Sequence, residues 1–455
     1  MERVDVAIVG GGPAGSAAAH EAAARGADTV VLEKGVPRAD RDGRPGSDAT
    51  DAAGMLDYWV DIMDFAPEEI PDEVILASLD GAEFIGPSES VTLHSTGMDA
   101  TYPEFGFAFH RARFDDWLRE RAEDAGAQYR IGTGVGGVDS ERGTAGWTHH
   151  LSLKDGTTIA AEHLILADGP QRTVTLDALD QFVPAGRSMR DHLGPNQANH
   201  IAYQEHRRMP EELFDPDLIR FWWGVMPGHT AYPWIFPNDD CVARIGLTMP
   251  IGMDLGDFPN RRAYALLRDE DERIPAGKQY IERLLEREFP EYDLKDFPLV
   301  EDRGKQKGTE AYPISSTRPV DSPVGADVAV VGGAMGATSA FHEGGDHVAV
   351  RTGKIAGRLA AQDRLGAYND EWHQAIGDEV LRNVTMADMV RDFEPPDWDR
   401  IFKTVRTMTD RGSYGLGDAV RGGLDALQLF ARYRWTQFRF RKARYAQFRE
   451  NEYVC

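Results

Sequence analysis

The segment Val4-Asp5-Val6-Ala7-Ile8-Val9-Gly10-Gly11-Gly12-Pro13-Ala14-Gly15 decides the fold of the first part of the chain. Its apolar run passes into G-x-G-x-x-G, an alanine-rich stretch follows, and Thr29-Val30-Val31-Leu32 ends in Glu33. The pattern predicts a strand, a glycine-rich turn, a helix and a second strand, with an acidic residue about twenty positions further on. The motif alone is weak evidence for a ligand. In this complete setting it predicts a dinucleotide-binding unit.

Each residue of the motif has a physical task. Gly10 allows the tight turn, Gly12 lets the backbone approach a pyrophosphate, and Gly15 lets the helix pack closely on the strand. The helix N-terminus carries a partial positive charge that suits phosphates. Glu33 can accept hydrogen bonds from a ribose diol.

Composition describes an acidic globular protein. The 455 residues carry a formal charge of −25, which argues against nucleic acid as a partner. Nine lysines stand against 41 arginines. An acidic, lysine-poor surface is typical of proteins from halophilic archaea that accumulate salt, because high salt screens the self-repulsion. The alternative is an ordinary acidic cytosolic enzyme.

Cysteine and hydropathy patterns limit the possible classes further. Two cysteines, Cys241 and Cys455, are too few for a disulfide framework or an iron–sulfur cluster. We see no metal-ligand spacing of Cys and His and therefore expect no metal. No apolar run is long enough to span a bilayer, and the first strand starts too early to leave room for a signal peptide. We expect a cytoplasmic protein, either free or bound peripherally to the cytoplasmic face of the membrane.

The order of elements predicts a discontinuous first domain. We expect 107–109 to form a strand that enters a helix ending near Gly126, 129–138 to form one strand, and Lys154-Asp155-Gly156-Thr157 to form a hairpin turn. The expected division is a cofactor domain at 1–60, 100–190 and 300–365, a substrate domain at 61–99 and 191–299, and a helical region at 366–455.

NAD and FAD both suit the first motif, so other segments must discriminate between them. Val330-Val331-Gly332-Gly333-Ala334-Met335-Gly336 lacks the spacing of a second fingerprint. A reductase with a separate nicotinamide domain is therefore not expected.

Four segments together resemble the geranylgeranyl reductase family, within the flavoproteins built like the aromatic hydroxylases. They are the fingerprint with Glu33, Arg111-Ala112-Arg113-Phe114-Asp115, Tyr232-Pro233-Trp234-Ile235-Phe236-Pro237 with Gly246, and residues 332–353. The third segment is the specific one, since many flavin enzymes share the first and the fourth.

The resemblance implies FAD and an α/β plus α+β fold. A Rossmann-like FAD-binding domain of the glutathione reductase or hydroxylase type would carry an inserted antiparallel-sheet substrate domain and a helical C-terminal tail. The expected cofactor-binding residues are Gly10, Gly12, Ala14, Gly15, Glu33, Lys34, Gly46, Arg111, Val135, Gly333, Gly336, Gly345 and Asp346.

The chain departs from the family at two cofactor positions. Gly333 stands where the family has an Asp that contacts the ribityl chain, and the lost acceptor is worth about 1–3 kcal/mol if its partner stays buried. Arg44-Pro45-Gly46-Ser47 stands where several archaeal members have a Lys-Pro-Cys-Gly-like loop.

The fourth segment also departs from the family. His342, Glu343, Asp346 and His347 replace small or apolar residues. They indicate a changed substrate or proton supply, or else a helix N-cap with a solvated turn.

The activity that the resemblance implies is reduction of carbon–carbon double bonds in a polyprenyl lipid, with hydride from N5 of reduced FAD. Tyr232, Trp234 and Phe236 alternate and would share one face of a strand, either lining an isoprenoid slot or packing on the core. The candidate proton donors are His342 and Tyr232. Electrons would come from a ferredoxin, an electron-transfer flavoprotein or reduced nicotinamide.

Three other functions remain possible. One is a flavin monooxygenase or halogenase, although the Trp-x-Trp-x-Ile-Pro pattern associated with halogenases is absent. The second is a dehydrogenase passing electrons from an electron-transfer flavoprotein to quinone, for which an iron–sulfur domain is usual. The third is a non-catalytic lipid-binding protein on a flavin fold.

The last segment, 421–455, has eight basic and three acidic residues, and aromatic residues lie among the arginines. A basic, aromatic helix is typical of contact with an anionic membrane surface. The alternative is a helix that docks on an acidic face of the protein itself. A lipid substrate favours membrane contact.

Overall fold

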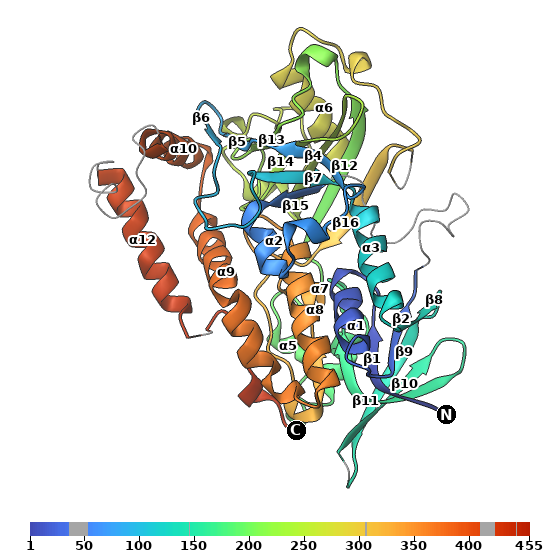
Figure 1. Ribbon diagram of the computed structural model, residues 1–455. Coiled ribbons are helices and arrows are strands. Elements are labelled where there is room, and N and C mark those ends of the chain that lie inside the picture. Colours follow the sequence, from blue (N-terminus) through green and yellow to red (C-terminus); the bar gives the residue numbers. More distant parts are fainter. Residues whose placement is uncertain (36–52, 145, 305–306, 410–423, 443) are drawn as a thin grey trace.

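The computed structural model describes residues 1–35, 53–144, 146–304, 307–409, 424–442 and 444–455, and the side chains of 408–409 and 424–428 lie outside this description. Two seven-stranded sheets form the centre of two halves, and long helices run beside both (Figure 1). We refer to the two sheets as the first sheet and the second sheet.

The first sheet has the order β8-β2-β1-β11-β10-β9, with β17 also paired to β11. Its members from β8 to β11, together with β17, are parallel, whereas β10 and β9 are antiparallel. Its central strands are apolar runs buried on both faces, as parallel strands require. The strands are β1 (Glu2–Val9), β2 (Thr29–Glu33), β8 (Gln128–Ile131), β9 (Val135–Arg142), β10 (Trp147–Leu153), β11 (Thr158–Leu166) and β17 (Val328–Val330).

The expected hairpin is confirmed, because residues 154–157 join the antiparallel pair β10 and β11. The expected single strand at 129–138 is wrong. The chain breaks at Gly132, whose φ is +68°, a left-handed conformation that glycine adopts without strain. Two strands, β8 and β9, lie on either side of that break and at opposite edges of the sheet.

Three helices, α1 (Pro13–Ala23), α3 (Arg111–Asp124) and α8 (Asp346–Ala361), pack together beside the first sheet. Glycines let α1 and α8 approach closely. A Cβ at Gly353 would lie 2.0 Å from the carbonyl oxygen of Ala14, and one at Gly357 would lie 2.0 Å from that of Ala18. The helices therefore contact each other backbone to backbone.

The second sheet has the order β16-β12-β15-β14-β13-β5-β6 and is antiparallel except for the pair β13 and β5. Helix α6 (Gly277–Glu288) covers one face with the buried side chains of Tyr280, Ile281, Leu284 and Leu285. The strands are β5 (Gly81–Ile85), β6 (Ser90–Leu93), β12 (His200–Arg208), β13 (Leu218–Trp222), β14 (Tyr232–Pro237), β15 (Val242–Pro250) and β16 (Thr309–Ile314).

The remaining elements connect or flank these halves. A three-stranded sheet has the order β3-β7-β4, formed by β3 (Ala53–Leu56), β7 (Gly106–Phe109) and β4 (Ile75–Leu79). The remaining α-helices within the described residues are α2 (Asp57–Met63), α4 (Thr175–Asp180), α5 (Met189–His192), α7 (Gly332–Met335), α9 (Tyr368–Val390), α10 (Pro395–Thr409) and α12 (Leu424–Phe440).

The fold class expected from the sequence is confirmed by this arrangement of a largely parallel sheet, an antiparallel sheet and C-terminal helices. The division into domains stays a proposal. Strand β16 pairs with β12 of the second sheet, which favours a boundary after Ile314 rather than at residue 300.

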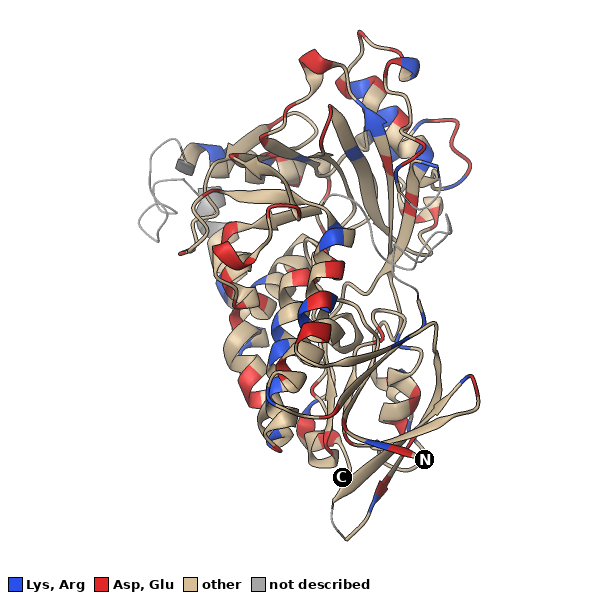
Figure 2. Cartoon of the chain, turned by 45° about the vertical axis from the view of Figure 1, so that its right-hand side comes forward, with Lys and Arg blue, Asp and Glu red and all other residues tan. Residues whose placement is uncertain are grey.

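Acidic and basic residues are spread over helices and loops of both halves (Figure 2). None of the helices in the described ranges combines the length and the apolar character needed to cross a membrane.

Candidate active site

One cavity of about 1140 Å³ joins the two halves of the molecule. Residues of the fingerprint line one part of it, and aromatic residues of the second sheet line another. The two groups of residues that the sequence singled out for cofactor and substrate therefore share one space.

The fingerprint turn forms as its sequence predicts. Gly10 has φ +103°, and a Cβ there would lie 2.4 Å from the carbonyl oxygen of Ala167, so no larger residue fits. A Cβ at Gly15 would lie 1.9 Å from the carbonyl oxygen of Gly10. Gly12 differs, because it lines the cavity and the space where its Cβ would stand is open. It is the N-cap of α1 without a side-chain cap, so the helix N-terminus is available to an anion.

Glu33 also lies where the sequence predicts, at the end of β2 on the cavity. Its carboxylate accepts hydrogen bonds from the N–H groups of Gly11 and Gly35, each at 2.6 Å. These bonds fix the carboxylate beside the turn. Lys34 and Val135 line the same region.

Arg111 and Asp346 are joined by an ion pair of 3.0 Å, although they lie far apart in sequence. Arg111 begins α3, Asp346 begins α8, and both line the cavity. Asp115 holds the other side of the guanidinium at 2.8 Å. The arginine is thus oriented before any ligand binds.

The other expected cofactor-binding residues do not all line the cavity. Ala14, Gly333 and Gly345 line the cavity. Gly336 is not among the lining residues. It ends α7 with φ +82°, and a Cβ there would lie 2.8 Å from Nη2 of Arg172. Gly46 and the Arg44-Pro45-Gly46-Ser47 loop lie outside the described residues.

Tyr232, Trp234 and Phe236 form a continuous aromatic face on β14 that lines the cavity. Ring centroids are 5.8 Å apart for Tyr232 and Trp234, and 5.7 Å apart for Trp234 and Phe236. The same rings belong to one hydrophobic cluster with Trp398 and Phe402 of α10. These three rings therefore line the cavity and are also part of the hydrophobic core, so the two alternatives do not exclude each other.

Three further aromatic residues extend this face and were not found from the sequence. Phe221 contacts Tyr232 and Phe236 at centroid distances of 5.7 and 5.5 Å and lines the cavity. Trp223 stacks on Tyr232 at 4.3 Å and on Phe341 at 5.2 Å, and both Trp223 and Phe341 line the cavity. Neither follows the alternation on β14. The face composed of Phe221, Trp223, Tyr232, Trp234, Phe236 and Phe341 is called the aromatic wall below.

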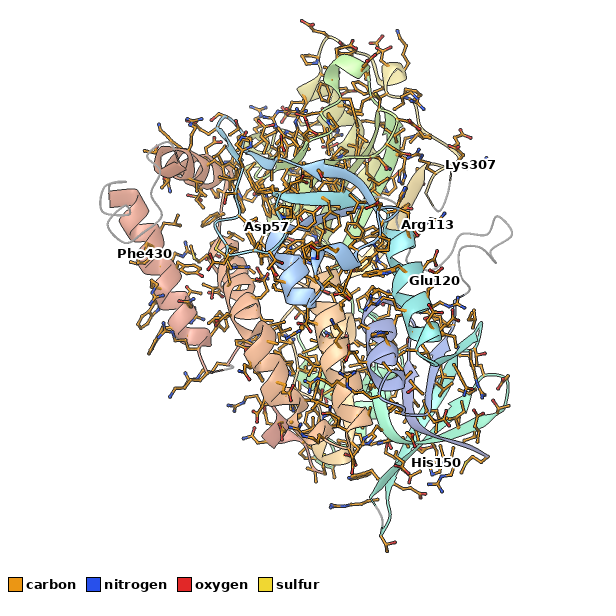
Figure 3. All side chains as sticks on the ribbon, in the orientation of Figure 1. Asp57, Arg113, Glu120, His150, Lys307 and Phe430 are labelled. Atoms are coloured by element: carbon orange, nitrogen blue, oxygen red, sulfur yellow. The ribbon has the colours of Figure 1, made fainter. Side chains whose placement is uncertain are left out.

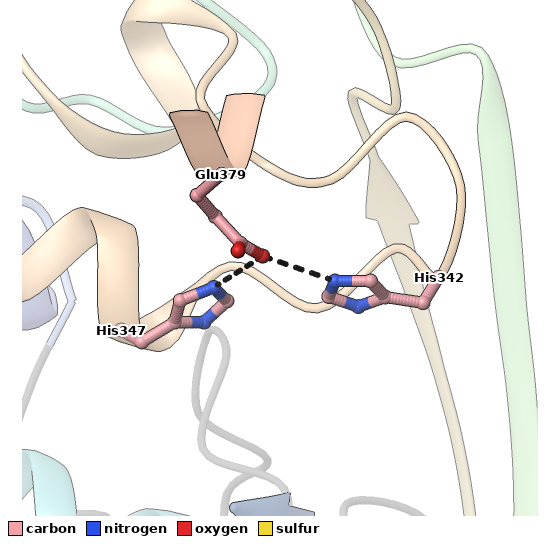
Figure 4. Close-up of side chains that lie close together, drawn as sticks. All are labelled: His342, His347 and Glu379. Carbon is pink, nitrogen blue, oxygen red and sulfur yellow. Dashed lines mark ion pairs between the residues drawn. The ribbon is translucent and has the colours of Figure 1, made fainter. Parts of the chain in front are cut away.

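The polar residues of the fourth segment are not a solvated turn, and that alternative is wrong. His347 is buried and stacks on Trp59 at 4.2 Å with an interplanar angle of 3°. Nε2 of His342 and Nε2 of His347 face Oε1 of Glu379 at 3.9 and 3.7 Å (Figure 4). Both histidines line the cavity.

Glu379 is the centre of this cluster. Burial raises the pKa of Glu379, but the two nearby histidines and the charge of Arg382 lower it more, so the group is held ionised. Burial lowers the pKa of His342. Two imidazoles and a carboxylate can bind a metal ion. Here the guanidinium of Arg382 on Oε2 and the amide of Asn383 on Oε1 already compensate the carboxylate.

Glu343 points the other way and is buried among uncharged partners. Its Oε1 accepts a hydrogen bond of 3.1 Å from the Thr230 hydroxyl, and Oε2 accepts one from the Thr248 hydroxyl. Nε2 of His200 lies 3.3 Å from Oε1. Burial raises the pKa of Glu343 to about 8.

The donor set fits a flavin dinucleotide. An uncapped helix N-terminus and an open Gly12 suit the pyrophosphate, and a fixed carboxylate at Glu33 suits a ribose diol. The oriented guanidinium of Arg111 lines the same cavity.

Comparison with known proteins agrees with this assignment. Residues 3–188 match a family model described as an FAD binding domain. Digeranylgeranylglycerophospholipid reductase 1 of Methanosphaera stadtmanae is 29% identical over 287 residues, 61% of each chain, so that match spans less than two thirds of the relative. Digeranylgeranylglycerophospholipid reductase 3 of the same organism is 26% identical over 412 residues, 88% of this chain and 90% of the relative.

A solved structure has the same fold. It is a geranylgeranyl bacteriochlorophyll reductase-like protein from Thermoplasma acidophilum, with a TM-score of 0.68 and 20% identity, covering 97% of this chain and 99% of that chain. FAD is the cofactor that these matches and the cavity support. The chain is thus similar to geranylgeranyl reductase-like FAD flavoproteins, and these similarities support an FAD-dependent oxidoreductase.

Proposed function

We propose that the protein reduces carbon–carbon double bonds in the polyprenyl chain of a lipid. The observation that carries the proposal is the single cavity lined both by the fingerprint and by the aromatic wall. The two Methanosphaera relatives are named for reduction of a geranylgeranyl lipid, which supports the same substrate class.

The size of the cavity supports a long apolar substrate beside the cofactor. Pockets for small ligands measure about 300–1,000 Å³, and this cavity of about 1140 Å³ exceeds that range. Its wall offers aromatic faces rather than hydrogen-bond donors.

Reduced FAD, when bound, supplies a hydride from N5. An isolated alkene has no carbonyl to polarise, so the protein needs no oxyanion hole. The aromatic wall positions the chain, excludes water and stabilises positive charge that develops on carbon, since ring faces attract cations.

Contact with a membrane surface is part of the proposal, through α12. Trp435 and Phe438 on this helix are 66% and 61% exposed and stack at 6.1 Å. Arg434 and Arg441 beside them are exposed. Aromatic and basic side chains together suit the interface of an anionic bilayer.

The opposite side of α12 docks on the protein itself. Arg439 lies 3.3 Å from Asp388 on α9, Arg432 lies 3.7 Å from Asp392, and Thr436 is buried. Phe430 marks this helix at the edge of the molecule in Figure 3. The helix thus has one face on acidic residues and one face free within the described chain, and the two alternatives from the sequence are compatible.

The test is reduction of a defined lipid. Holoprotein in high salt is reduced anaerobically with dithionite, which makes the natural electron donor unnecessary, and mixed with digeranylgeranylglyceryl phospholipid in vesicles. Mass spectrometry should find products heavier by pairs of hydrogen atoms, together with reoxidation of the flavin. A reduced flavin that stays reduced, with unchanged lipid, would reject the proposal.

A further inference from the structure

We propose that Glu343 delivers the proton needed for reduction of each double bond, and that His229 and His200 restore this proton from solvent. The inference rests on the proposed function. It concerns the loop between α7 and α8, whose residues 338 and 341–345 line the cavity.

Glu343 is in the right place. It lines the cavity together with Thr248 and Tyr232 and lies in the loop that ends at the N-terminus of α8. Its backbone has φ +61°, a conformation that non-glycine residues seldom adopt and that is often kept at functional sites. The carboxyl group reaches the hydroxyl groups of Thr248 on β15 and of Thr230 just before β14.

Its surroundings keep the carboxyl group protonated. The groups that face it are His200 from β12, Tyr232 from β14, Thr248 from β15 and Thr230 from the loop before β14. Burial, and then His229, lower the pKa of His200 to about 3, so this imidazole is neutral. No Lys or Arg is among the described hydrogen-bond and ion-pair partners of Glu343. Because no positive charge offsets the effect of burial, the pKa of Glu343 is raised to about 8.

The other candidate donors are less suitable. The hydroxyl of Tyr232 donates to the carbonyl oxygen of His342 at 2.5 Å, so its hydrogen is already used. Burial raises the pKa of Tyr232 well above its usual value. His342 faces the ionised Glu379, and burial lowers the pKa of its imidazole.

A route for a new proton leads outward from Glu343. The Thr230 hydroxyl bonds Oε1 of Glu343 at 3.1 Å and lies 2.9 Å from Nε2 of His200. The ring of His229 stands edge-on to that of His200 at a centroid distance of 5.9 Å, and Nδ1 of His200 has no hydrogen-bond partner within the described residues, so a water molecule between the rings would complete the link. His229 is exposed, so the chain of groups ends in solvent.

Reduction of one double bond consumes one hydride and one proton. The π bond of the alkene breaks, one carbon forms a C–H bond with the hydride from reduced FAD, and the other forms a C–H bond with the Glu343 proton. The O–H bond of Glu343 breaks and leaves a carboxylate. A proton from water, passed through His229, His200 and Thr230, restores the acid.

The experiment compares Glu343→Gln with the wild type, because glutamine keeps the shape and cannot supply the proton. Glu310→Gln is the control, a buried carboxyl of the same sheet that does not line the cavity. Single-turnover oxidation of the reduced flavin by lipid should slow by about 100-fold or more in Glu343→Gln only. In the wild type the rate should fall above about pH 8, and in Glu343→Gln this fall should disappear.

Infrared spectra give a readout that needs no turnover. The carbonyl band of a protonated carboxyl group should be lost between pH 6 and pH 9 in the wild-type protein and in Glu310→Gln, and should be missing in Glu343→Gln at both pH values. His229→Ala should leave the first turnover unchanged and slow the later ones.

The outcomes separate the two proposals. An active wild type with an equally fast Glu343→Gln overturns the role of Glu343 alone, as does a wild-type protein without the titrating infrared band. A wild type that reduces no polyprenyl lipid overturns the proposed function and the role of Glu343 with it.

Discussion

Gly246 on β15 lies directly against the indole ring of Trp234, its partner across the sheet on β14. A Cβ at Gly246 would lie 2.6 Å from Cε2 and Cζ2 of the ring. The absence of a side chain lets the indole lie flat on the neighbouring strand and complete the aromatic wall. This contact explains why the aromatic segment and a later glycine belong to one motif.

Gly246→Ala should displace Trp234 into the cavity, because the added methyl group cannot fit beneath the ring. We expect a changed tryptophan fluorescence and a kcat/KM for the lipid lowered by about tenfold, with FAD affinity unchanged. Gly366→Ala is the control, since a Cβ there meets nothing within 4 Å. An unchanged kcat/KM would show that the position of the ring has no part in substrate binding.

Glu33→Gln should weaken FAD binding. Hydrogen bonds to a charged group contribute about 1.5–3 kcal/mol, which corresponds to a loss of about ten- to a hundredfold in affinity. Fluorescence titration of the apoprotein with FAD measures it. Glu162→Gln, an exposed residue on β11, should bind FAD as the wild type does; equal affinities of all three proteins would contradict the assigned role.

Gly353→Ala should destabilise the fold at the crossing of α1 and α8. The added Cβ would lie 2.0 Å from a backbone oxygen, and overpacking of this kind costs about 1–3 kcal/mol. Chemical unfolding followed by circular dichroism gives the free energy of unfolding, with Gly366→Ala as the matched alanine control. If Gly353→Ala has the same free energy of unfolding as Gly366→Ala, then α1 and α8 can move apart without loss of stability.

Much of the cofactor site could be predicted because its signals are local. The turn at Gly10, the open position at Gly12 and the acid at Glu33 follow from short-range backbone requirements. Alternation on β14 likewise placed Tyr232, Trp234 and Phe236 on one face.

What the sequence could not predict depends on contacts between distant segments. Trp223 joins the aromatic wall only because β13 pairs with β14. The burial of Glu343 depends on Thr230, Thr248 and His200 meeting in the second sheet. Gly336 has the family spacing, yet Arg172 and Arg318 occupy the space beside it. Of these, only Thr248 carried a local signal, since it shares a strand face with Gly246.

Glu343→Gln should also change how stability depends on pH. The pKa of Glu343 is about 8 in the folded chain and 4.5 ordinarily, so between these values the folded state holds more protons than the unfolded state. Stability from this group therefore falls as pH rises through that window. The Tm of Glu343→Gln relative to the wild type should increase from about pH 5 to about pH 8; a constant difference would mean that Glu343 ionises normally.

Trp435→Ser with Phe438→Ser should reduce binding to anionic vesicles, because these side chains supply the exposed apolar area of α12. Sedimentation with vesicles in low and high salt measures this binding. Ile251→Ser, at an exposed position directly after β15 in the other half of the molecule, serves as the control. Equal sedimentation of both variants would argue against α12 as the membrane contact.

The hydroxyl of Tyr232 holds the peptide that precedes Glu343. A hydrocarbon chain that presses on the Tyr232 ring therefore pushes, through one hydrogen bond, on the backbone that carries the acid. Binding of the chain and the position of the Glu343 carboxyl group are therefore coupled. We expect hydrocarbon chains of different width to be protonated at different rates even where hydride transfer is equally fast.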